Sequence, residues 1–178
     1  MENVFLNSTT RNRFSWNDLG AIHEGREHLG EEMPVLFYRL MQFAMREELN
    51  RAYGREAVNR HFKEAGRLAG AEFAKNSLEL YLSFDCFAAH LANIMLQMKI
   101  GILRFESVID DGLEIILTVS EDLDCSGLPA SGKLVCNYNE GFIAGILEIY
   151  TGKNYNVSET DCWATGDRTC RYLCKLEL

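Results

Sequence analysis

The sequence predicts one α+β domain, in which a layer of helices packs on an antiparallel sheet of about four strands that ends in a C-terminal hairpin. From residue 34 to residue 98, apolar residues recur every three or four positions, as they do on helices. From residue 103 they alternate with polar residues, as on strands. The resulting order of helices, hairpin, helix and hairpin favours helices on one face of an antiparallel sheet. A length of 178 residues with 47% apolar residues suits one ordinary domain.

Residues 1–32 keep no helical period for more than a turn and are predicted to form an N-terminal arm. One short strand fits within it, and its aromatic residues Phe5, Phe14 and Trp16 would pack the arm on the rest of the chain. Residues 33–178 are therefore predicted to form a single ligand-binding domain.

Three helices are predicted at about residues 34–53, 56–75 and 84–98. Pro34 suits a first helical turn and Gly54 ends the first helix, while Ser83 suits the N-cap of the third. Apolar residues cover more than one side of the first helix, which is typical of a helix that is central or shared with a second subunit. Gly66 and Gly70 would let another helix approach the second one closely.

A hairpin is predicted around Asp111-Gly112, because Leu103 and Phe105 on one side and residues 113–119 on the other alternate with more polar neighbours. A loop, about residues 122–129, leads to a fourth helix that Ser131 would cap and that would run to Thr151. Two more strands are predicted at about residues 154–159 and 169–178.

The charge and hydropathy of the chain exclude several classes of partner. A formal net charge of −8 opposes binding to a phosphate backbone, so we expect no direct contact with nucleic acid. Polar residues interrupt the longest apolar run, residues 86–103, and would be costly inside a bilayer. The first residues lack a basic region followed by an apolar one. We therefore expect a cytoplasmic protein that neither spans nor binds a membrane.

Four of the six cysteines lie between residues 136 and 174, together with a carboxylate at a suitable spacing. In a reducing cytosol such clusters bind metals more often than they form disulfides, although three disulfides stay open as an alternative. The C-terminal hairpin would bring Glu159, Cys162 and Cys170 together, and helix packing would add Cys136. Three thiolates and one carboxylate fill a tetrahedral zinc site of the structural type, with iron left open.

The remaining cysteines fit this site less well. Cys174 points the same way as Cys170 but lies about 13 Å further along the strand, which is too far to share one ion. Cys86 at a helix start and Cys125 in a loop are interpreted as ordinary cysteines, with a redox role for Cys86, Cys125 or Cys174 as the alternative.

The segments Cys136-Asn-Tyr-Asn-Glu-Gly141-Phe-Ile-Ala-Gly145 and Glu159-Thr-Asp-Cys162-Trp-Ala-Thr-Gly166-Asp167-Arg-Thr-Cys170-Arg-Tyr172 resemble the 4-vinyl reductase domain family over about residues 100–178. The resemblance implies zinc held by Cys136, Glu159, Cys162 and Cys170. It also implies a dimeric, small-molecule-binding fold, shared with subunits of a vesicle-transport tethering particle and with haem-based nitric oxide sensors. Family members sense aromatic hydrocarbons, occur in redox regulators or act in bacteriochlorophyll synthesis.

The expected function is a non-catalytic, zinc-containing sensor for a small apolar or aromatic ligand. The sequence holds no nucleotide-binding glycine loop, no Gly-x-Ser-x-Gly and no His-Glu-x-x-His, which favours a protein that is not an enzyme. A homodimer is expected, and signalling would need a separate regulatory partner because no DNA-binding or ATPase domain is attached. A thiol redox sensor and an enzyme or accessory protein of tetrapyrrole metabolism are the alternatives. The expected pocket residues are Phe87, His90, Leu113, Ile115, Phe142 and Ile146.

Overall fold

The structure is a computed structural model that describes residues 14–177. By its internal contacts the chain divides into two units, residues 1–32 and 33–178, and each is described by itself. Within the first unit, residues 14–32 hold a 3-10 turn, Trp16–Leu19, and a single helical turn, α1 (Ile22–Gly25). No strand occurs in residues 14–32, and Phe5 lies outside the described part of the chain.

The second unit is built on an antiparallel sheet. Its strands among the described residues are β1 (Ile102–Ile109), β2 (Glu114–Ser120), β3 (Tyr155–Asp161) and β4 (Thr169–Leu176). They lie in the order β1-β2-β4-β3, and every neighbouring pair is antiparallel. On β2 the alternating residues Ile115, Leu117 and Val119 are buried, as their period of two predicts. The predicted α+β class with a four-stranded antiparallel sheet is confirmed.

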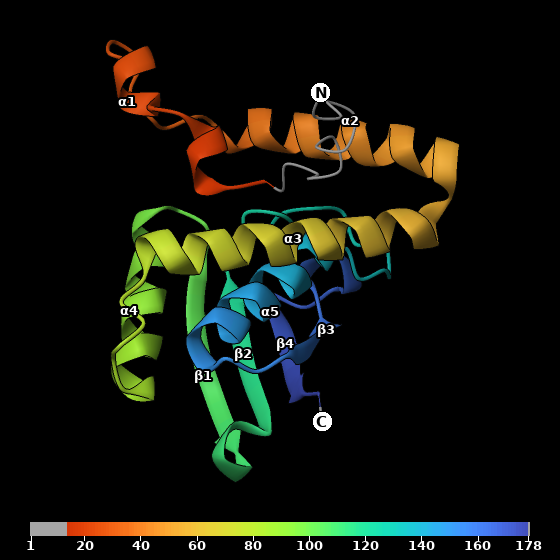
Figure 1. The fold of residues 1–178 in the computed structure, drawn as a ribbon. Coiled ribbons are helices and arrows are strands. Elements are labelled where there is room, and N and C mark those ends of the chain that lie inside the picture. Colours follow the sequence, from red (N-terminus) through yellow and green to blue (C-terminus); the bar gives the residue numbers. More distant parts are fainter. Residues whose placement is uncertain (1–13, 178) are drawn as a thin grey trace, which may run out of the picture. The chain divides into compact units, whose positions relative to one another are not determined.

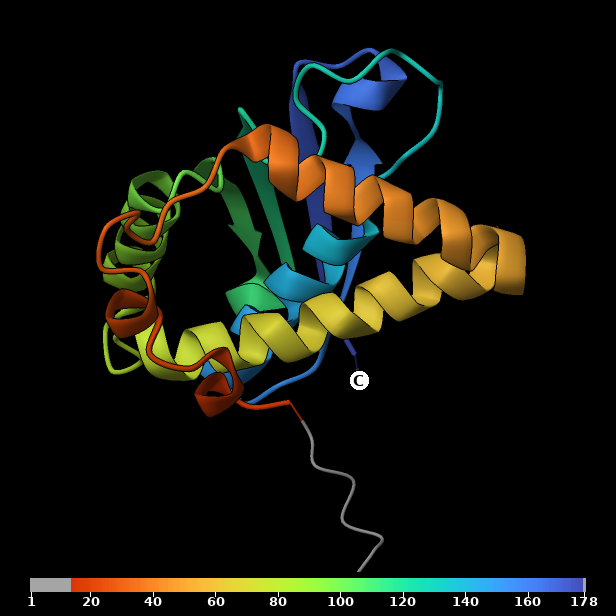
Figure 2. The same cartoon turned by 90° about the horizontal axis from the view of Figure 1, so that it is seen from above.

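Helices cover one face of this sheet (Figure 1). They are α2 (Val35–Tyr53), α3 (Arg55–Ser77), α4 (Phe84–Gln97) and α5 (Asn137–Thr151). The helix α5 packs against β3, α4 packs against β1, and α3 lies over α5. Seen from above, α2 and α3 form a helical hairpin that opens away from the turn between them (Figure 2).

Glycines allow α3 and α5 to pack backbone against backbone. A Cβ atom on Gly141 would lie 1.8 Å from the carbonyl oxygen of Lys63, and one on Gly70 would lie 2.1 Å from that of Phe142. Both distances are far below contact distance, so only glycine fits at these crossings. The helix contact expected from Gly66 and Gly70 is therefore present, and its partner is α5.

The helix α5 begins five residues later than the sequence predicted. Ser131 does not cap it, because the backbone N–H groups of Ser131 and Gly132 both donate to the carbonyl oxygen of Ala164. The segment before α5 is thus bonded to the turn between β3 and β4, and Cys136 stands at the N-cap instead. A tertiary contact has overridden the local capping preference.

The helix α2 presents a largely apolar surface to solvent. None of its residues is buried, and Leu36 and Phe37 are 71% and 64% exposed. Leu40, Met41 and Met45 are exposed as well. The predicted spread of apolar residues around this helix is present, but within the described chain much of it has no cover.

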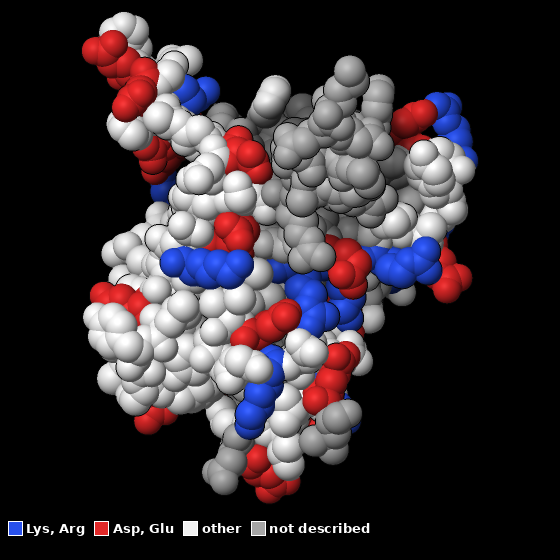
Figure 3. All heavy atoms as spheres, in the orientation of Figure 1, with Lys and Arg blue, Asp and Glu red and all other residues white. Residues whose placement is uncertain are grey.

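The distribution of surface charge and the length of the helices relate to binding of nucleic acids and membranes. On the face drawn in Figure 3, basic and acidic side chains are interspersed, and neither sign forms a continuous field. No helix in the described part of the chain combines the length and the apolar character needed to cross a bilayer.

Candidate metal centre

Four buried cysteine side chains meet between the sheet and the N-terminus of α5. Cys125 comes from the loop between β2 and α5, Cys136 from the N-cap of α5, Cys162 from the start of the turn after β3 and Cys170 from β4. Their sulfur atoms all lie within 4.8 Å of one another, and each residue is at most 1% exposed. This is the group of ligand-type side chains in residues 14–177 that is compact enough to hold a metal ion.

The spacing of the sulfurs suits a tetrahedral ion. Zinc binds thiolate sulfur at about 2.3 Å, so two sulfurs of one tetrahedron lie about 3.8 Å apart. Cys136 Sγ lies 3.8 Å from Cys162 Sγ and 3.8 Å from Cys170 Sγ, while Cys125 Sγ and Cys170 Sγ are closer, at 3.1 Å. The four sulfurs need only small shifts to surround one ion.

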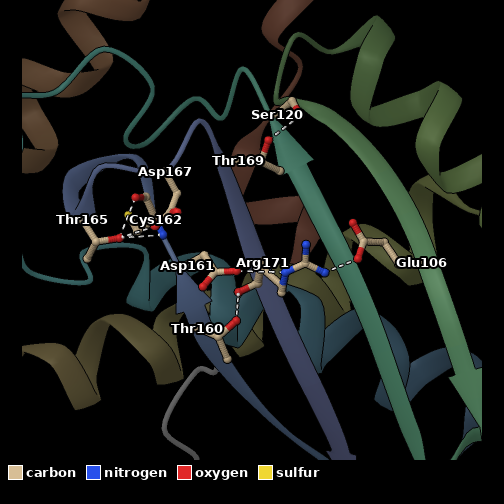
Figure 4. Close-up of polar contacts among 9 residues, drawn as sticks. All are labelled: Glu106, Ser120, Thr160, Asp161, Cys162, Thr165, Asp167, Thr169 and Arg171. Carbon is tan, nitrogen blue, oxygen red and sulfur yellow. Dashed lines mark hydrogen bonds and ion pairs between the residues drawn. The ribbon is translucent and has the colours of Figure 1, made fainter.

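The turn after β3 fixes the backbone of Cys162. Its N–H donates to Thr165 Oγ1 at 3.0 Å, and its carbonyl oxygen accepts from the backbone N–H groups of Thr165 and Asp167. Thr165 Oγ1 also lies 2.9 Å from the carboxylate of Asp167 (Figure 4). Gly166, at φ +109°, takes the left-handed conformation that closes the turn.

Outside the cysteine cluster, Arg171 connects the β3–β4 hairpin to β1 at the opposite edge of the sheet. Its Nε donates to Asp161 on β3 at 2.9 Å, and its guanidinium also pairs with Glu106 on β1 (Figure 4). Arg171 lies on β4, so its side chain reaches across β2. The strand that leads to Cys162 and the strand that carries Cys170 are thereby held in one sheet.

The predicted ligand Glu159 lies beside the four sulfurs but is not part of that group. Its Oε2 accepts the backbone N–H of Cys136 at 3.1 Å, and its carboxyl group contacts the thiols of Cys136 and Cys162. Its Oε1 is buried without a hydrogen-bond partner among the described residues. Burial is the main cause that raises the pKa of Glu159 to about 8. Glu159 is thus a further possible ligand, a carboxylate beside four thiols.

The cysteine thiols strongly perturb one another. Hydrogen bonding with Cys125, then with the other sulfurs, lowers the pKa of Cys162 and raises that of Cys136. The pKa of Cys170 is also raised, first by its hydrogen bond with Cys125. Ionisation of Cys162 is favoured, whereas Cys136 and Cys170 are held protonated. Several neighbouring thiolates would repel one another in this buried space without a cation. A bound cation removes this conflict, since thiols that coordinate a metal lose their protons.

Cys174 and Cys86 lie apart from the cluster. Cys174 is buried on β4 between Ile115 and Val157 of the flanking strands, and burial raises the pKa of its thiol to about 12. Cys86 is exposed on α4.

Sequence reasoning did not single out Cys125 as a candidate ligand. It stands eleven residues before Cys136 with no paired-cysteine spacing, so no local signal marked it. The path of its loop is set by Asp122, whose carboxylate accepts the N–H of Asp124 at 2.8 Å and the side-chain amide of Asn139 on α5 at 2.8 Å. These contacts turn the chain back toward α5 and Cys170.

The same loop is bonded to α2. Tyr38 donates its hydroxyl to Asp124 at 2.7 Å, and Arg39 Nε donates to the carbonyl oxygen of Leu123 at 2.8 Å. Burial, followed by the nearby charge of Asp124, raises the pKa of Tyr38. Further along α2, Arg46 bonds to Asn137 and to the carbonyl oxygen of Val135, next to Cys136. Polar contacts therefore join α2 to both ends of the loop.

A separate apolar space lies between the sheet and the helices α4 and α5. Its volume is about 10 Å³, which is close to the minimum that one water molecule needs. No polar atom lines it. The side chains that surround it are Leu91, Met95, Leu103, Phe105, Leu117, Ile143, Ile146 and Leu147.

The predicted pocket residues are distributed over several environments. Ile146 lines the apolar space, whereas Ile115 borders a surface depression near Tyr155, and Leu113 is 45% exposed. Phe87 stacks on Tyr150 at 3.7 Å and Phe142 packs against Phe73 at 5.2 Å. His90 is half-buried, and its Nε2 has no hydrogen-bond partner within residues 14–177. The structure does not gather these six residues in one place.

Known proteins resemble this chain in sequence. The family model of the V4R domain matches residues 115–176. An uncharacterised protein of Methanocaldococcus jannaschii is 30% identical over 152 residues, which are 84% of this chain and 82% of that protein. A second from the same organism is 28% identical over 160 residues, which are 90% of this chain and 86% of that protein.

Solved structures share the fold. The phenol-responsive sensory domain of the transcription activator PoxR matches with a TM-score of 0.61 at 20% identity, over 82% of this chain and 77% of that one. A vinyl-4-reductase family protein from Methanocaldococcus jannaschii matches with a TM-score of 0.57 at 15% identity, over 88% and 93%. A trafficking protein particle complex subunit 3 from Naegleria fowleri gives 0.63 at 18% identity, over 81% and 95%. An H-NOX protein from S. oneidensis gives 0.53 at 14%, over 77% and 72%. These likenesses confirm the fold relations that the sequence motif implied.

Proposed function

Because the chain belongs to the V4R domain family, we propose that it is a zinc-binding domain that senses a small apolar ligand and is not an enzyme. The observation that carries the ligand is the space between the sheet, α4 and α5, whose lining is apolar throughout. Two proteins with the same fold support a ligand of this kind, one solved with phenol and one covalently bound to palmitic acid.

The metal is proposed to be zinc, held by Cys136, Cys162 and Cys170 with a fourth donor from Cys125 or Glu159. Soft thiolate ligands favour zinc over magnesium or calcium, and the buried, closed cluster suits a structural ion. The ion would join the N-terminus of α5 to the hairpin of β3 and β4. When bound, it supplies a positive charge that keeps the buried thiolates ionised.

The ligand must displace side chains to enter. A space of about 10 Å³ holds no more than a water molecule, so α4 or its side chains have to move away from β1 before a ring or an alkyl chain fits. A change in the position of α4 is then the signal that a sensor could transmit.

We propose that the protein is cytoplasmic and forms a homodimer, and the exposed apolar residues of α2 support the dimer. A separate regulatory partner would recognise the ligand-bound state.

Calorimetric titration with toluene and phenol tests the ligand proposal. The lining offers phenol no partner for its hydroxyl group. A buried unsatisfied polar group costs about 1–3 kcal/mol, so toluene should bind about 5- to 150-fold more tightly. Met95→Phe should fill the space and abolish binding. Met98→Phe, on an exposed residue one turn further along the chain, is the matched control and should bind normally.

A result in which neither compound binds the parent protein, or in which both variants bind equally, would contradict this proposal. Native mass spectrometry of the protein as purified offers a second approach, because a ligand acquired in the cell appears as an extra mass that organic solvent removes.

A redox sensor is the second candidate, favoured by the 3.1 Å separation of the sulfurs of Cys125 and Cys170. Peroxide could oxidise this pair to a disulfide, with loss of two protons and two electrons from the thiols and reduction of the peroxide to water. Counting free thiols before and after mild peroxide treatment tests it, since an unchanged count leaves no pair to switch.

A further inference from the structure

Five donor groups surround a metal position that has room for four. Cys136, Cys162 and Cys170 are common to every arrangement, so the coordination depends on a choice between the thiolate of Cys125 and the carboxylate of Glu159. Resting on the proposed metal site, we propose that Cys125 is the fourth ligand and that Glu159 is a positioning residue, which holds Cys136 and leaves the ion to four sulfurs.

The geometry of the sulfurs favours Cys125. Its sulfur lies 3.1 Å from that of Cys170 and within 4.8 Å of the other two, so all four fit around one point. The carboxylate oxygens of Glu159 do not join this mutual set. A fourth thiolate also matches the softness of the other three ligands better than an oxygen does.

Glu159 already has a structural partner that fixes its position. Its Oε2 accepts the N–H of Cys136, an amide at the N-cap of α5, and its own backbone N–H donates to Glu140 Oε1 on the first turn of α5 at 2.8 Å. Glu140 in turn pairs with Lys63 of α3 at 3.6 Å. These bonds join β3 to the start of α5 and set the direction in which Cys136 enters the site. This is the role that residues behind the ligands of metal sites usually have.

Hydrogen bonds that do not depend on a metal hold the loop of Cys125 beside the other three cysteines. Asp122 bonds the loop to Asn139, Tyr38 and Arg39 bond it to α2, and Trp163 Nε1 donates to the carbonyl oxygen of Leu128 at 3.0 Å on the other side of Cys125. Cys125 is 0% exposed, and its loop is held on both sides. The cysteine therefore needs no large loop movement to bind an ion.

Binding of the ion through Cys125 would stabilise segments beyond the β3–β4 hairpin. With Cys125 as a ligand, the ion ties the loop between β2 and α5 to β4, and through Tyr38 and Arg39 it adds to the attachment of α2. With Glu159 as the ligand, the ion would join only α5, β3 and β4, and the loop would gain nothing from the metal.

X-ray absorption spectroscopy of the full-length zinc-loaded protein counts the sulfurs directly. The parent should show four sulfur neighbours at about 2.3 Å and no oxygen neighbour. Glu159→Gln should keep all four sulfurs and lose about 10- to 100-fold in zinc affinity, as removal of a group that orients a ligand does. Cys125→Ser should show three sulfurs and one lighter neighbour, with a larger loss of affinity. Cobalt substitution gives an independent check, because thiolate-to-cobalt absorption weakens with each thiolate lost.

Three sulfurs and one oxygen in the parent, unchanged in Cys125→Ser, would overturn the assignment of Cys125 while leaving the zinc proposal intact. A parent protein that takes up no zinc would overturn the metal site and this ligand together. If Cys125→Ser does not fold, the sulfur counts of the parent and of Glu159→Gln still decide between the two donors.

Discussion

The hydroxyl of Tyr38 on α2 donates a 2.7 Å hydrogen bond to the carboxylate of Asp124, the residue before Cys125. A helix with a largely exposed apolar surface is thus bonded to the loop that carries Cys125 of the cysteine cluster. The stability of that loop, the cysteine cluster and α2 should be linked.

Tyr38→Phe should destabilise the metal-free protein by about 1–3 kcal/mol, because a buried carboxylate loses a hydrogen-bond donor. Urea denaturation measures the change in the free energy of unfolding. Tyr53→Phe, on the same helix but 67% exposed, is the control and should change stability little. Equal effects of the two substitutions would show that the bond to Asp124 does not stabilise the loop.

Cys136→Ser should abolish zinc binding and with it the stabilisation that zinc gives. A ligand that binds only the folded chain adds about 4 kcal/mol at a free concentration one thousand times its dissociation constant, and the variant should lose that increment. Thermal denaturation with and without added zinc measures it. Cys86→Ser removes an exposed cysteine of α4 and should respond to zinc like the parent. A Cys136→Ser protein that zinc still stabilises would disprove this role.

Gly141→Ala should destabilise the domain by about 1–3 kcal/mol, because the new methyl group would lie 1.8 Å from the carbonyl oxygen of Lys63 and would push α3 and α5 apart. Gly25→Ala is the control, since a Cβ atom there meets nothing within 4 Å. The free energies of unfolding of both variants test this. A Gly141→Ala protein as stable as the parent would mean that the two helices do not cross so closely.

Thiol reactivity should separate the six cysteines into three classes. In the zinc-loaded protein only exposed Cys86 should react quickly with an alkylating reagent. After a chelator removes the zinc, the four clustered thiols should also react, but more slowly than Cys86. Cys174 should stay unreactive in both states, because it is buried and its pKa is raised to about 12. Mass spectrometry of the labelled peptides gives the rates, and rapid labelling of the cluster in the presence of zinc would argue against a bound ion.

The sequence was most informative where neighbouring residues share one element. The alternation of Ile115, Leu117 and Val119 predicted their burial on β2, and the short distance along the hairpin placed Cys162 near Cys170. Cys125 could not be recognised in this way, because its position depends on bonds from Asp122 to α5 and from Leu123 to α2. Such contacts between distant segments leave no periodic pattern.

The start of α5 shows the same limit. A serine before an apolar run predicts an N-cap, but the amide of Ser131 bonds to Ala164 in the β3–β4 turn, and the helix begins only after Cys136.

The apolar pocket was also only partly predictable. Ile146 lines it, whereas Phe87 and Phe142 contribute to aromatic contacts in the core instead. Spacing in the sequence identifies a buried face but not the gaps within it.

Elemental analysis combined with native mass spectrometry of the protein, purified without chelators, shows whether the cysteine cluster binds zinc. We expect one zinc ion per chain, lost together with its stabilising effect in Cys136→Ser and retained in Cys86→Ser. A folded protein that contains no metal, takes up none when zinc is added and has its clustered cysteines joined in disulfides would contradict this expectation.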